Sequence, residues 1–194
     1  MKKLLLFSLM ALLVVTGCSR KGEDVLTNNN TTSTTDPAKF VLNATTASYG
    51  EGVFTPPEGI EPENIYLTVV SVQLRKAGDS LGWITVAEPN ATYDFLQLVD
   101  GVTAELTSVA IEPGRYTMLR LILAETNEIV FDGTSESLTV PSGTETGVKL
   151  SFDVVIEGSE TLTATVVFDV ATSVISTEQD YLLRPSFRLV IDSE

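Results

Sequence analysis

Apolar and polar residues alternate along most of the chain that follows residue 38. The alternation is regular in four stretches, which comprise residues 119–123, 148–156, 162–170 and 181–191. In the second stretch, Leu150 and Phe152 fall on one face of an extended chain, and Lys149 and Asp153 fall on the other. A repeat of two residues is typical of strands that turn one face to a core and one to water. These stretches therefore predict half-buried β-strands.

Residues 65–76 have a different pattern, because both faces are apolar as far as Ser71. Such a run predicts a central strand that becomes exposed near its end. We expect residues 181–191 to form one regular final strand, in which Pro185 indicates a sheet edge or a bulge. Residues 94–98 suit either a single helical turn or a strand.

Turn-forming residue pairs separate these segments at short intervals. Asp100-Gly101 and Asp132-Gly133 are expected to form ordinary hairpin turns, because such pairs tolerate the positive φ angles that tight hairpins require. The chain has about ten predicted strands and no convincing helical stripe. The expected fold is all-β, an antiparallel two-sheet sandwich that residues 39–194 form as a single domain.

The first residues have the pattern of an export signal rather than that of a folded domain. Lys2 and Lys3 precede an apolar run, residues 4–15, which is shorter than the roughly 20 residues of a transmembrane helix. Small residues then lead to Cys18, the only cysteine of the chain. This arrangement resembles the bacterial lipobox. Residues 1–17 are therefore predicted to be a lipoprotein signal peptide, and Cys18 is predicted to be lipidated.

Residues 18–38 lack apolar periodicity and contain a run of Asn and Thr between residues 28 and 35. This segment cannot bury enough apolar surface to fold, so we expect a flexible polar linker. Acyl chains on Cys18 would hold the mature protein on a lipid bilayer without crossing it. Ser19 stands where an Asp would indicate inner-membrane retention in enterobacteria. We therefore expect the mature protein to be located at the outer membrane of the bacterial envelope, on its periplasmic face or at the cell surface.

The amino-acid composition excludes several kinds of catalytic and metal-binding site. The chain has no histidine, which excludes a Ser-His-Asp or Cys-His nucleophile and an imidazole metal ligand. A single cysteine permits no internal disulfide. The formal charge is −14, and it becomes −16 once loss of Lys2 and Lys3 leaves 10 basic residues against 26 acidic ones. Such a charge repels a phosphate backbone, so no nucleic-acid partner is expected. No motif indicates a cofactor.

A series of short motifs runs through the chain between about residues 66 and 190. In order, they are Val70-Ser71-Val72, Gly82-Trp83, Tyr93-Asp94-Phe95-Leu96, Pro113-Gly114-Arg115-Tyr116, Val140-Pro141-Ser142-Gly143, Gly147-Val148-Lys149-Leu150, Phe168-Asp169 and Leu183-Arg184-Pro185. Their order and spacing resemble the family named domain of unknown function 4382, whose members are mostly bacterial and archaeal lipoproteins or secreted proteins. The resemblance implies a sandwich of immunoglobulin or transthyretin type and brings no established activity. Val167 stands where the family often has Asp, which weakens the idea of a cation site with Asp169.

Several residues are candidates for binding. The acids that we consider for a loop calcium site are Asp94, Asp100, Asp132 and Asp169. The Asp-x-Asp-x-Asp-Gly loop is absent, and Asp-Gly pairs also form plain turns. Trp83 and Tyr93 would form a platform for sugar rings, although a Trp is more often a half-buried packing residue. Arg184 and Arg188, with Arg120 nearby, suggest an anion site, although surface salt bridges are the ordinary role of such residues.

No carboxylate pair lies in a segment that resembles the floor of a cleft, so we expect no enzymatic activity. The leading interpretation is a membrane-anchored envelope lipoprotein whose β-sandwich binds a glycan or an envelope protein. The alternative is a structural subunit of a pilus- or fimbria-like assembly that polymerises by strand exchange. That alternative needs residues 181–191 to leave their own sheet, although Phe187, Leu189 and Ile191 have the pattern of core residues.

Overall fold

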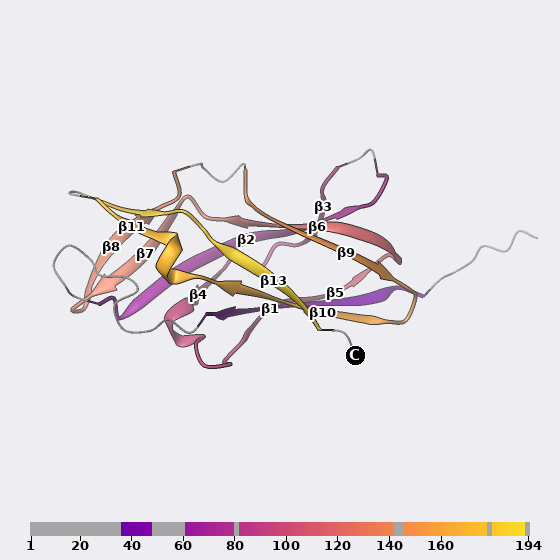
Figure 1. Cartoon of the computed structure of the whole chain (residues 1–194), viewed down its shortest axis with the longest axis horizontal. Helices are drawn as coiled ribbons and strands as arrows, with labels where there is room; N and C mark the ends of the chain where they lie inside the picture. Colours follow the sequence, from indigo (N-terminus) through magenta and orange to yellow (C-terminus); the bar gives the residue numbers. More distant parts are fainter. Residues whose placement is uncertain (1–35, 48–60, 80–81, 142–145, 178–179, 193–194) are drawn as a thin grey trace, which may run out of the picture. The chain divides into compact units, whose positions relative to one another are not determined.

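The structure is a computed structural model that describes residues 36–47, 61–79, 82–141, 146–177 and 180–192. These residues form two β-sheets (Figure 1). The predicted signal peptide, Cys18 and the predicted linker up to residue 35 lie outside the described residues. Within the described ranges, no helix has the length and apolar character needed to span a bilayer.

The smaller sheet has four strands whose side chains alternate between the core and the outside. In spatial order they are β13 (Phe187–Asp192), β10 (Thr161–Phe168), β1 (Ala38–Thr46) and β5 (Ala104–Ile111). In β1, Phe40 and Leu42 are fully buried, as the two-residue repeat requires. β1 runs parallel to β10, with Lys39 opposite Thr161, and antiparallel to β5.

The larger sheet has nine strands. Seven of them follow one another in the order β11 (Val174–Ser176), β12 (Tyr181–Leu183), β8 (Thr134–Thr139), β7 (Thr126–Phe131), β2 (Asn64–Lys76), β6 (Gly114–Leu123) and β9 (Val148–Ile156). The other two, β3 (Ile84–Ala87) and β4 (Ala91–Asp94), both pair with β2.

The long strand β2 has neighbours along both edges. Near its start, Tyr66 pairs with Asp94 of β4 and with Glu128 of β7. Near its end, Gln73 pairs with β3 and with β6. β6 and β7 therefore follow one edge of β2, and β3 and β4 follow the other. This arrangement confirms the central strand that the apolar run 65–76 predicted.

A buried asparagine bridges the break between β6 and β7. Asn127 accepts a hydrogen bond at Oδ1 from the backbone N–H of Thr68, at 2.9 Å, and donates from Nδ2 to the carbonyl of Ala124, at 3.0 Å. Its side chain thus replaces ladder hydrogen bonds that the backbone does not make where β6 ends and β7 begins. Asn127 is almost fully buried, so these contacts are shielded from water.

The core lies between the sheets and is lined by side chains of both. Its largest fully buried residues are Phe40, Phe95, Phe168, Leu42, Ile65, Leu67, Leu74, Leu119, Leu121, Ile129, Leu138 and Leu183. Phe95, in the 3-10 helix η1 (Phe95–Gln97), packs edge-to-face on Phe168 with ring centroids 5.2 Å apart. Phe187 contacts both rings. Burial of each such side chain contributes about 1.5–3 kcal/mol, which makes this packing the main stabilising term of the sandwich.

The predicted all-β, two-sheet sandwich is confirmed, but its strands are not all antiparallel. β1 pairs in parallel with β10, and β8 pairs in parallel with β12. A parallel pair requires a long connection in place of a tight turn, and most of the chain separates β1 from β10. The expectation of a wholly antiparallel sandwich is therefore wrong for these two pairs, and both sheets are mixed.

Residues 181–191 do not form the single strand that their alternation predicted. β12 belongs to the larger sheet and β13 to the smaller one, with Pro185 between them. Because proline cannot donate to a ladder, a strand is easily interrupted there. The crossing is held by Ser173, the last residue of the short helix α1 (Val170–Ser173), whose buried Oγ accepts a hydrogen bond of 2.9 Å from the N–H of Ser186.

One of the two Asp-Gly pairs is a hairpin turn. Asp132 and Gly133 have φ angles of 47° and 72° and join β7 directly to β8, as a type I′ turn requires. Asp100 and Gly101 also have positive φ, but they lie on the connection that leaves the larger sheet through η1 and enters the smaller sheet at β5. The expectation of a hairpin at Asp100-Gly101 is therefore wrong. Residues 95–97 form a helical turn after β4 ends.

Candidate binding surface

The candidate surface lies on the outer face of the larger sheet, where β3, β2, β6 and β9 run side by side. In β6, Leu119 and Leu121 are buried in the core, so Arg120 between them projects from the opposite face. The ladders place Arg120 opposite Gln73 of β2 and opposite Lys149 of β9. These polar side chains consequently form a row across the outside of the sheet.

Arg120 is held in one orientation by its neighbours. Its guanidinium carbon Cζ lies 4.5 Å from the centre of the Trp83 ring. Its Nε donates a hydrogen bond of 2.7 Å to Gln73 Oε1, and its Nη2 donates to the same oxygen. Gln73 donates in turn from Nε2 to Thr85 Oγ1, at 3.2 Å. Partial burial lowers the pKa of Arg120 from its usual value, but an arginine keeps its charge at neutral pH.

The strands that form this face carry several basic residues although the chain as a whole is acidic. The basic residues of β2, β6 and β9 are Arg75, Lys76, Arg115, Arg120 and Lys149. Two of them form ion pairs, Lys76 with Glu112 at 2.8 Å and Arg115 with Asp153 at 2.5 Å. Within the described part of the chain, the other three have no acidic partner. We call Arg75, Arg120 and Lys149, together with Trp83, the cationic face.

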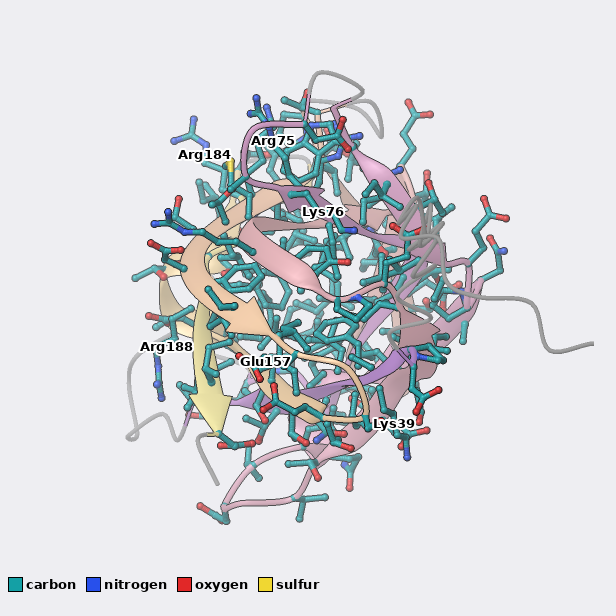
Figure 2. All side chains as sticks on the ribbon, turned by 90° about the vertical axis from the view of Figure 1, so that its right-hand side faces the viewer. Lys39, Arg75, Lys76, Glu157, Arg184 and Arg188 are labelled. Atoms are coloured by element: carbon teal, nitrogen blue, oxygen red, sulfur yellow. The ribbon has the colours of Figure 1, made fainter. Side chains whose placement is uncertain are left out.

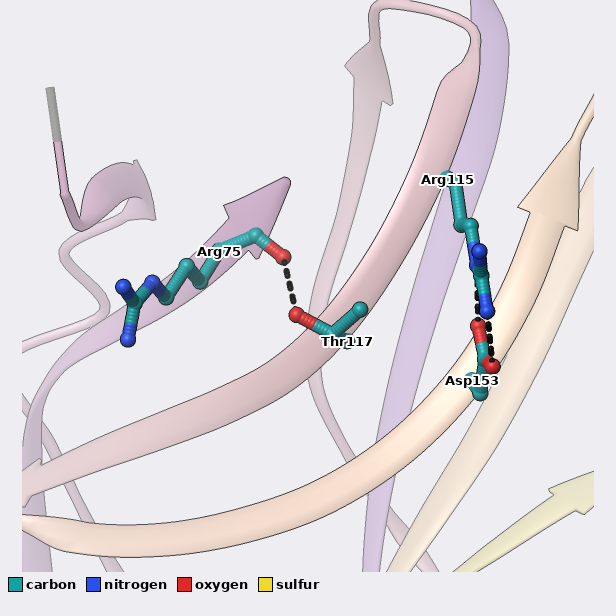
Figure 3. A network of polar contacts seen from close by, with 4 residues as sticks. All are labelled: Arg75, Arg115, Thr117 and Asp153. Atoms are coloured by element: carbon teal, nitrogen blue, oxygen red, sulfur yellow. Dashed lines mark hydrogen bonds and ion pairs between the residues drawn. The ribbon is translucent and has the colours of Figure 1, made fainter. Parts of the chain in front are cut away.

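Figure 3 contrasts two of these arginines. Arg115 donates from Nε and Nη2 to the two carboxylate oxygens of Asp153, and these hydrogen bonds lower the pKa of Asp153. The backbone carbonyl of Arg75 accepts a hydrogen bond of 3.5 Å from Thr117 Oγ1, whereas its guanidinium extends away from that contact. Arg115 is therefore occupied by its own chain, while the charged group of Arg75 is exposed to solvent.

The chain that leads into β9 packs directly against the sheet beside Arg120. A Cβ atom at Gly147, whose φ is +59°, would lie 2.6 Å from Ile122 Cδ1 and 2.8 Å from Arg120 Cγ. Only glycine permits this close approach.

Ser71, which pairs with Ile122, is buried, and its Oγ has no hydrogen-bond partner among the described residues. This crowded region bounds the cationic face on one side.

The structure separates the two aromatic residues that were predicted to share a platform. Tyr93 lies opposite Leu67 of β2, whereas Ile84, the residue after Trp83, lies opposite Leu74. Seven residues of an extended strand span roughly 23 Å, so Trp83 and Tyr93 do not form one stacking surface. Tyr93 packs against the core, and burial raises its pKa. A role in ligand binding stays a prediction for each residue separately.

Asp94 is engaged by hydrogen bonds at the other end of β2. Its Oδ2 accepts a hydrogen bond of 2.5 Å from Asn64 Nδ2. Its Oδ1 accepts from the backbone N–H groups of Ile65 and Leu96, at 3.2 and 3.1 Å. The carboxylate thus joins the start of β2 to η1 and caps that helix, which is a structural task.

The other three predicted calcium ligands lie on different elements. Asp169 caps α1 by accepting a hydrogen bond of 3.2 Å from the N–H of Thr172. Asp132 and Asp100 occupy the two turns described above. Among the residues that the structure describes, no three acidic or cysteine side chains converge on one point. Calcium binding by any of these residues stays a prediction.

Gln73 and Lys149 were not among the binding residues predicted from the sequence, and Arg120 was grouped there with the arginines near the C-terminus. Arg188 lies on β13 of the smaller sheet, whereas Arg120 lies on β6 of the larger one. Figure 2 shows Arg188 and Arg75 on different sides of the folded residues. The alternation in β6 and β9 was a usable signal, because it predicts that Arg120 and Lys149 point outward. It does not reveal that the two strands are neighbours.

The fold and its surface define an all-β sandwich that carries a cationic, aromatic patch on one sheet. A family model described as Domain of unknown function (DUF4382) matches residues 57–185. The match covers more than half of the chain, so the chain belongs to this family, as the order of its motifs indicated. No curated protein and no solved structure gives a significant match.

Proposed function

We propose that this chain is a lipid-anchored protein of the bacterial cell envelope and that its sandwich is a non-catalytic binding domain. The observation that carries the proposal is the Arg120 guanidinium, stacked on Trp83 and hydrogen-bonded to Gln73. Trp and Arg are the residue types that most often dominate binding interfaces. A charged group that is already oriented loses less conformational freedom when a ligand binds, which favours affinity.

Anchoring is supported by the sequence before the domain. Cys18 follows an apolar run and small residues, and it is the only cysteine of the chain. The polar segment between Cys18 and the start of β1 at Ala38 would hold the sandwich away from the lipid surface. We propose the outer membrane as the site of attachment.

A non-catalytic role is supported by the chemistry of the available side chains. The sequence offers no histidine as a general base. Asp94 and Asp169 accept backbone hydrogen bonds that cap short helices. The alternative of a strand-exchanging pilus subunit has weaker support. Phe187, at the start of the final strand, contacts Phe95 and Phe168 in the core and would have to leave them.

The binding function is tested with the mature lipidated protein in phosphatidylcholine nanodiscs, applied to a glycan array and to envelope extracts. We expect a reproducible ligand whose binding is lost in Trp83→Ala. Tyr66→Ala is the matched control and should retain binding, because Tyr66 lies between the buried Ile65 and Leu67 and is therefore an outward-facing aromatic residue near the start of β2. If the protein is folded and binds nothing on the array or in the extracts, the proposal is contradicted.

The anchor is tested separately in intact cells. Cys18→Ala should abolish incorporation of a labelled fatty acid and release the protein from the membrane fraction. Protease treatment of intact cells then distinguishes the two faces of the outer membrane. Cleavage places the domain at the cell surface, and protection places it in the periplasm. Membrane association that survives Cys18→Ala would contradict lipid anchoring.

A further inference from the structure

We infer that the ligand of the cationic face is a polysaccharide that carries carboxylate groups, and that Arg75, Arg120 and Lys149 bind those groups. The inference rests on the binding function proposed above and gives that function a chemical class of ligand. Three properties of the face support it, namely cations that have no acidic partner among the described residues, donors on Arg120 that have no acceptor among them, and the spacing of the cations.

The first property is that Arg120 and Lys149 have no acidic partner in the described part of the chain. Arg120 and Lys149 face each other directly across the β6–β9 ladder, and like charges in such positions destabilise a sheet. Acidic residues are abundant, 26 against 12 basic ones, and the neighbouring Arg115 and Lys76 each have an acidic partner. No acidic side chain of the described ranges pairs with Arg120 or Lys149. An anion from outside the chain would relieve their repulsion.

The second property is the set of hydrogen-bond donors on Arg120. A guanidinium has five N–H groups, and one on Nε and one on Nη2 bind Gln73. The others have no acceptor among the residues that the structure describes. Since Trp83 and Gln73 fix the plane of the group, its remaining donors point in a set direction. A carboxylate, with two acceptor oxygens, matches such donors and forms charge-assisted hydrogen bonds.

The third property is spacing. Arg120 and Lys149 lie on adjacent strands, roughly 5 Å apart at the backbone, and Arg75 lies two residues beyond Gln73, roughly 7 Å along β2. The three cations are spread over the outside of a sheet and do not converge on one point. A hollow of about 510 Å³ lies beside Arg75 and is lined by residues of β2 and β6 and by the turn residues Ala77, Gly78 and Asp79. Carboxylates repeated along a sugar chain suit this distribution better than a single phosphate does.

Two other polyanions suit the face less well. Basic clusters that bind anionic membranes contain about four to eight Lys or Arg residues, whereas this face has three. Nucleic acid carries one charge per about 1.7 Å of duplex, and a domain in a chain of net charge −14 would repel it strongly. An acidic polysaccharide has a lower charge density, so local attraction outweighs the repulsion from the rest of the chain.

The test uses the mature lipidated protein in phosphatidylcholine nanodiscs and measures binding by calorimetry. The carboxylated probes are polygalacturonate, alginate and hyaluronan, dextran is the neutral polysaccharide, and phosphatidylglycerol vesicles are the anionic membrane. We expect binding to at least one carboxylated probe and to neither of the others. Because screening weakens exposed charge contacts, affinity should fall about fivefold or more between low and physiological salt.

Two variants assign the binding to the face. Lys149→Gln and Arg120→Gln should each lower the affinity about fivefold, since each removes one charge-assisted contact of about 1 kcal/mol. Lys149 is exposed, so its variant keeps the fold. Arg188→Gln is the matched control, because it makes the same charge change on β13 of the smaller sheet. Its affinity should equal that of the unmodified protein.

Unchanged affinity in both variants would overturn the inference, as would equal binding to dextran or binding to the vesicles in place of the polysaccharides. A ligand whose binding depends on Trp83 but not on these charges would overturn the ligand class and leave the binding function standing. If the protein binds none of the probes, nothing on the glycan array and nothing in the envelope extracts, both the ligand class and the binding function are contradicted.

Discussion

Polar side chains near the two ends of β2 differ in whether they have partners within the described part of the chain. Near the start of the strand, the Asp94 carboxylate and the Asn127 side chain are satisfied by backbone and amide donors and acceptors. Near its end, Arg75 and Arg120 carry charges that have no acidic partner among the described residues, and Lys149 faces Arg120. At one end the polar groups complete the sheet, and the other end carries the face that we propose as a binding site.

This contrast separates stability from function along a single strand. Polar groups that complete a sheet should cost stability when they are removed and should leave binding unchanged. Polar groups that await a ligand should have the opposite effect, because natural proteins often hold functional groups in arrangements that do not favour stability. The following predictions test this division, beginning with the largest expected effect.

Asn127→Ala should lower the free energy of unfolding by about 3 kcal/mol. The change leaves the partly buried Thr68 N–H and Ala124 carbonyl without the Asn127 side chain as partner, and each such group costs roughly 1–3 kcal/mol. Urea denaturation measures the loss. Thr126→Ala, at the exposed neighbouring position, should stay within about 0.5 kcal/mol of the unmodified protein. A loss below about 1 kcal/mol for Asn127→Ala would show that the bridge between β6 and β7 is dispensable.

Asp94→Ala should cost about 2 kcal/mol, because it removes the acceptor of three hydrogen bonds at a half-buried site. Asp94→Asn keeps one carbonyl oxygen and should lose about half as much. Thermal unfolding in calcium and in chelator provides the contrast with a metal site. If Asp94 acts only as a cap, Asp94→Ala should lower Tm by the same amount in calcium and in chelator. A shift that Asp94→Ala abolishes would make Asp94 a ligand in place of a cap.

The contrast also shows what local sequence can predict. The two-residue repeat reports which face of a strand is buried, so it was sufficient for the strands around Leu121 and Leu150. It also continued across Pro185, although the chain changes sheets there. The choice between one sheet and two depends on distant partners such as Ser173, which the repeat does not record.

The candidate site depends on distant contacts in the same way. Trp83 and Tyr93 were grouped because they are close in sequence, but each lies beside a different end of β2. Trp83 instead meets Arg120, nearly forty residues later in the chain, because β3 and β6 lie on opposite edges of the same strand. No local pattern contains this register, since it is set by long-range strand pairing.

Ser71→Ala should raise the free energy of unfolding by about 1 kcal/mol. Ser71 lies toward the end of β2 that carries the cationic face, and its buried Oγ has no hydrogen-bond partner in the described part of the chain. Replacing an unsatisfied hydroxyl by an apolar group removes a desolvation penalty. Val69→Ala is the control in the opposite direction, because it truncates a buried apolar side chain nearby and should destabilise. A destabilised Ser71→Ala protein would mean that the hydroxyl has a partner.

Lys149→Gln should have the smallest effect on stability, a gain of about 0.3 kcal/mol, because it removes a like charge directly opposite Arg120. The gain should be largest at low salt and should vanish at high salt, where the repulsion is screened. Paired urea titrations of the variant and the unmodified protein at the two salt concentrations measure the difference. The same variant is expected to bind the acidic polysaccharide about fivefold more weakly, so stability and affinity should change in opposite directions. A loss of stability that does not depend on salt would mean that Lys149 contributes to the sheet in the way that Asn127 does, and the division between the two ends of β2 would fail.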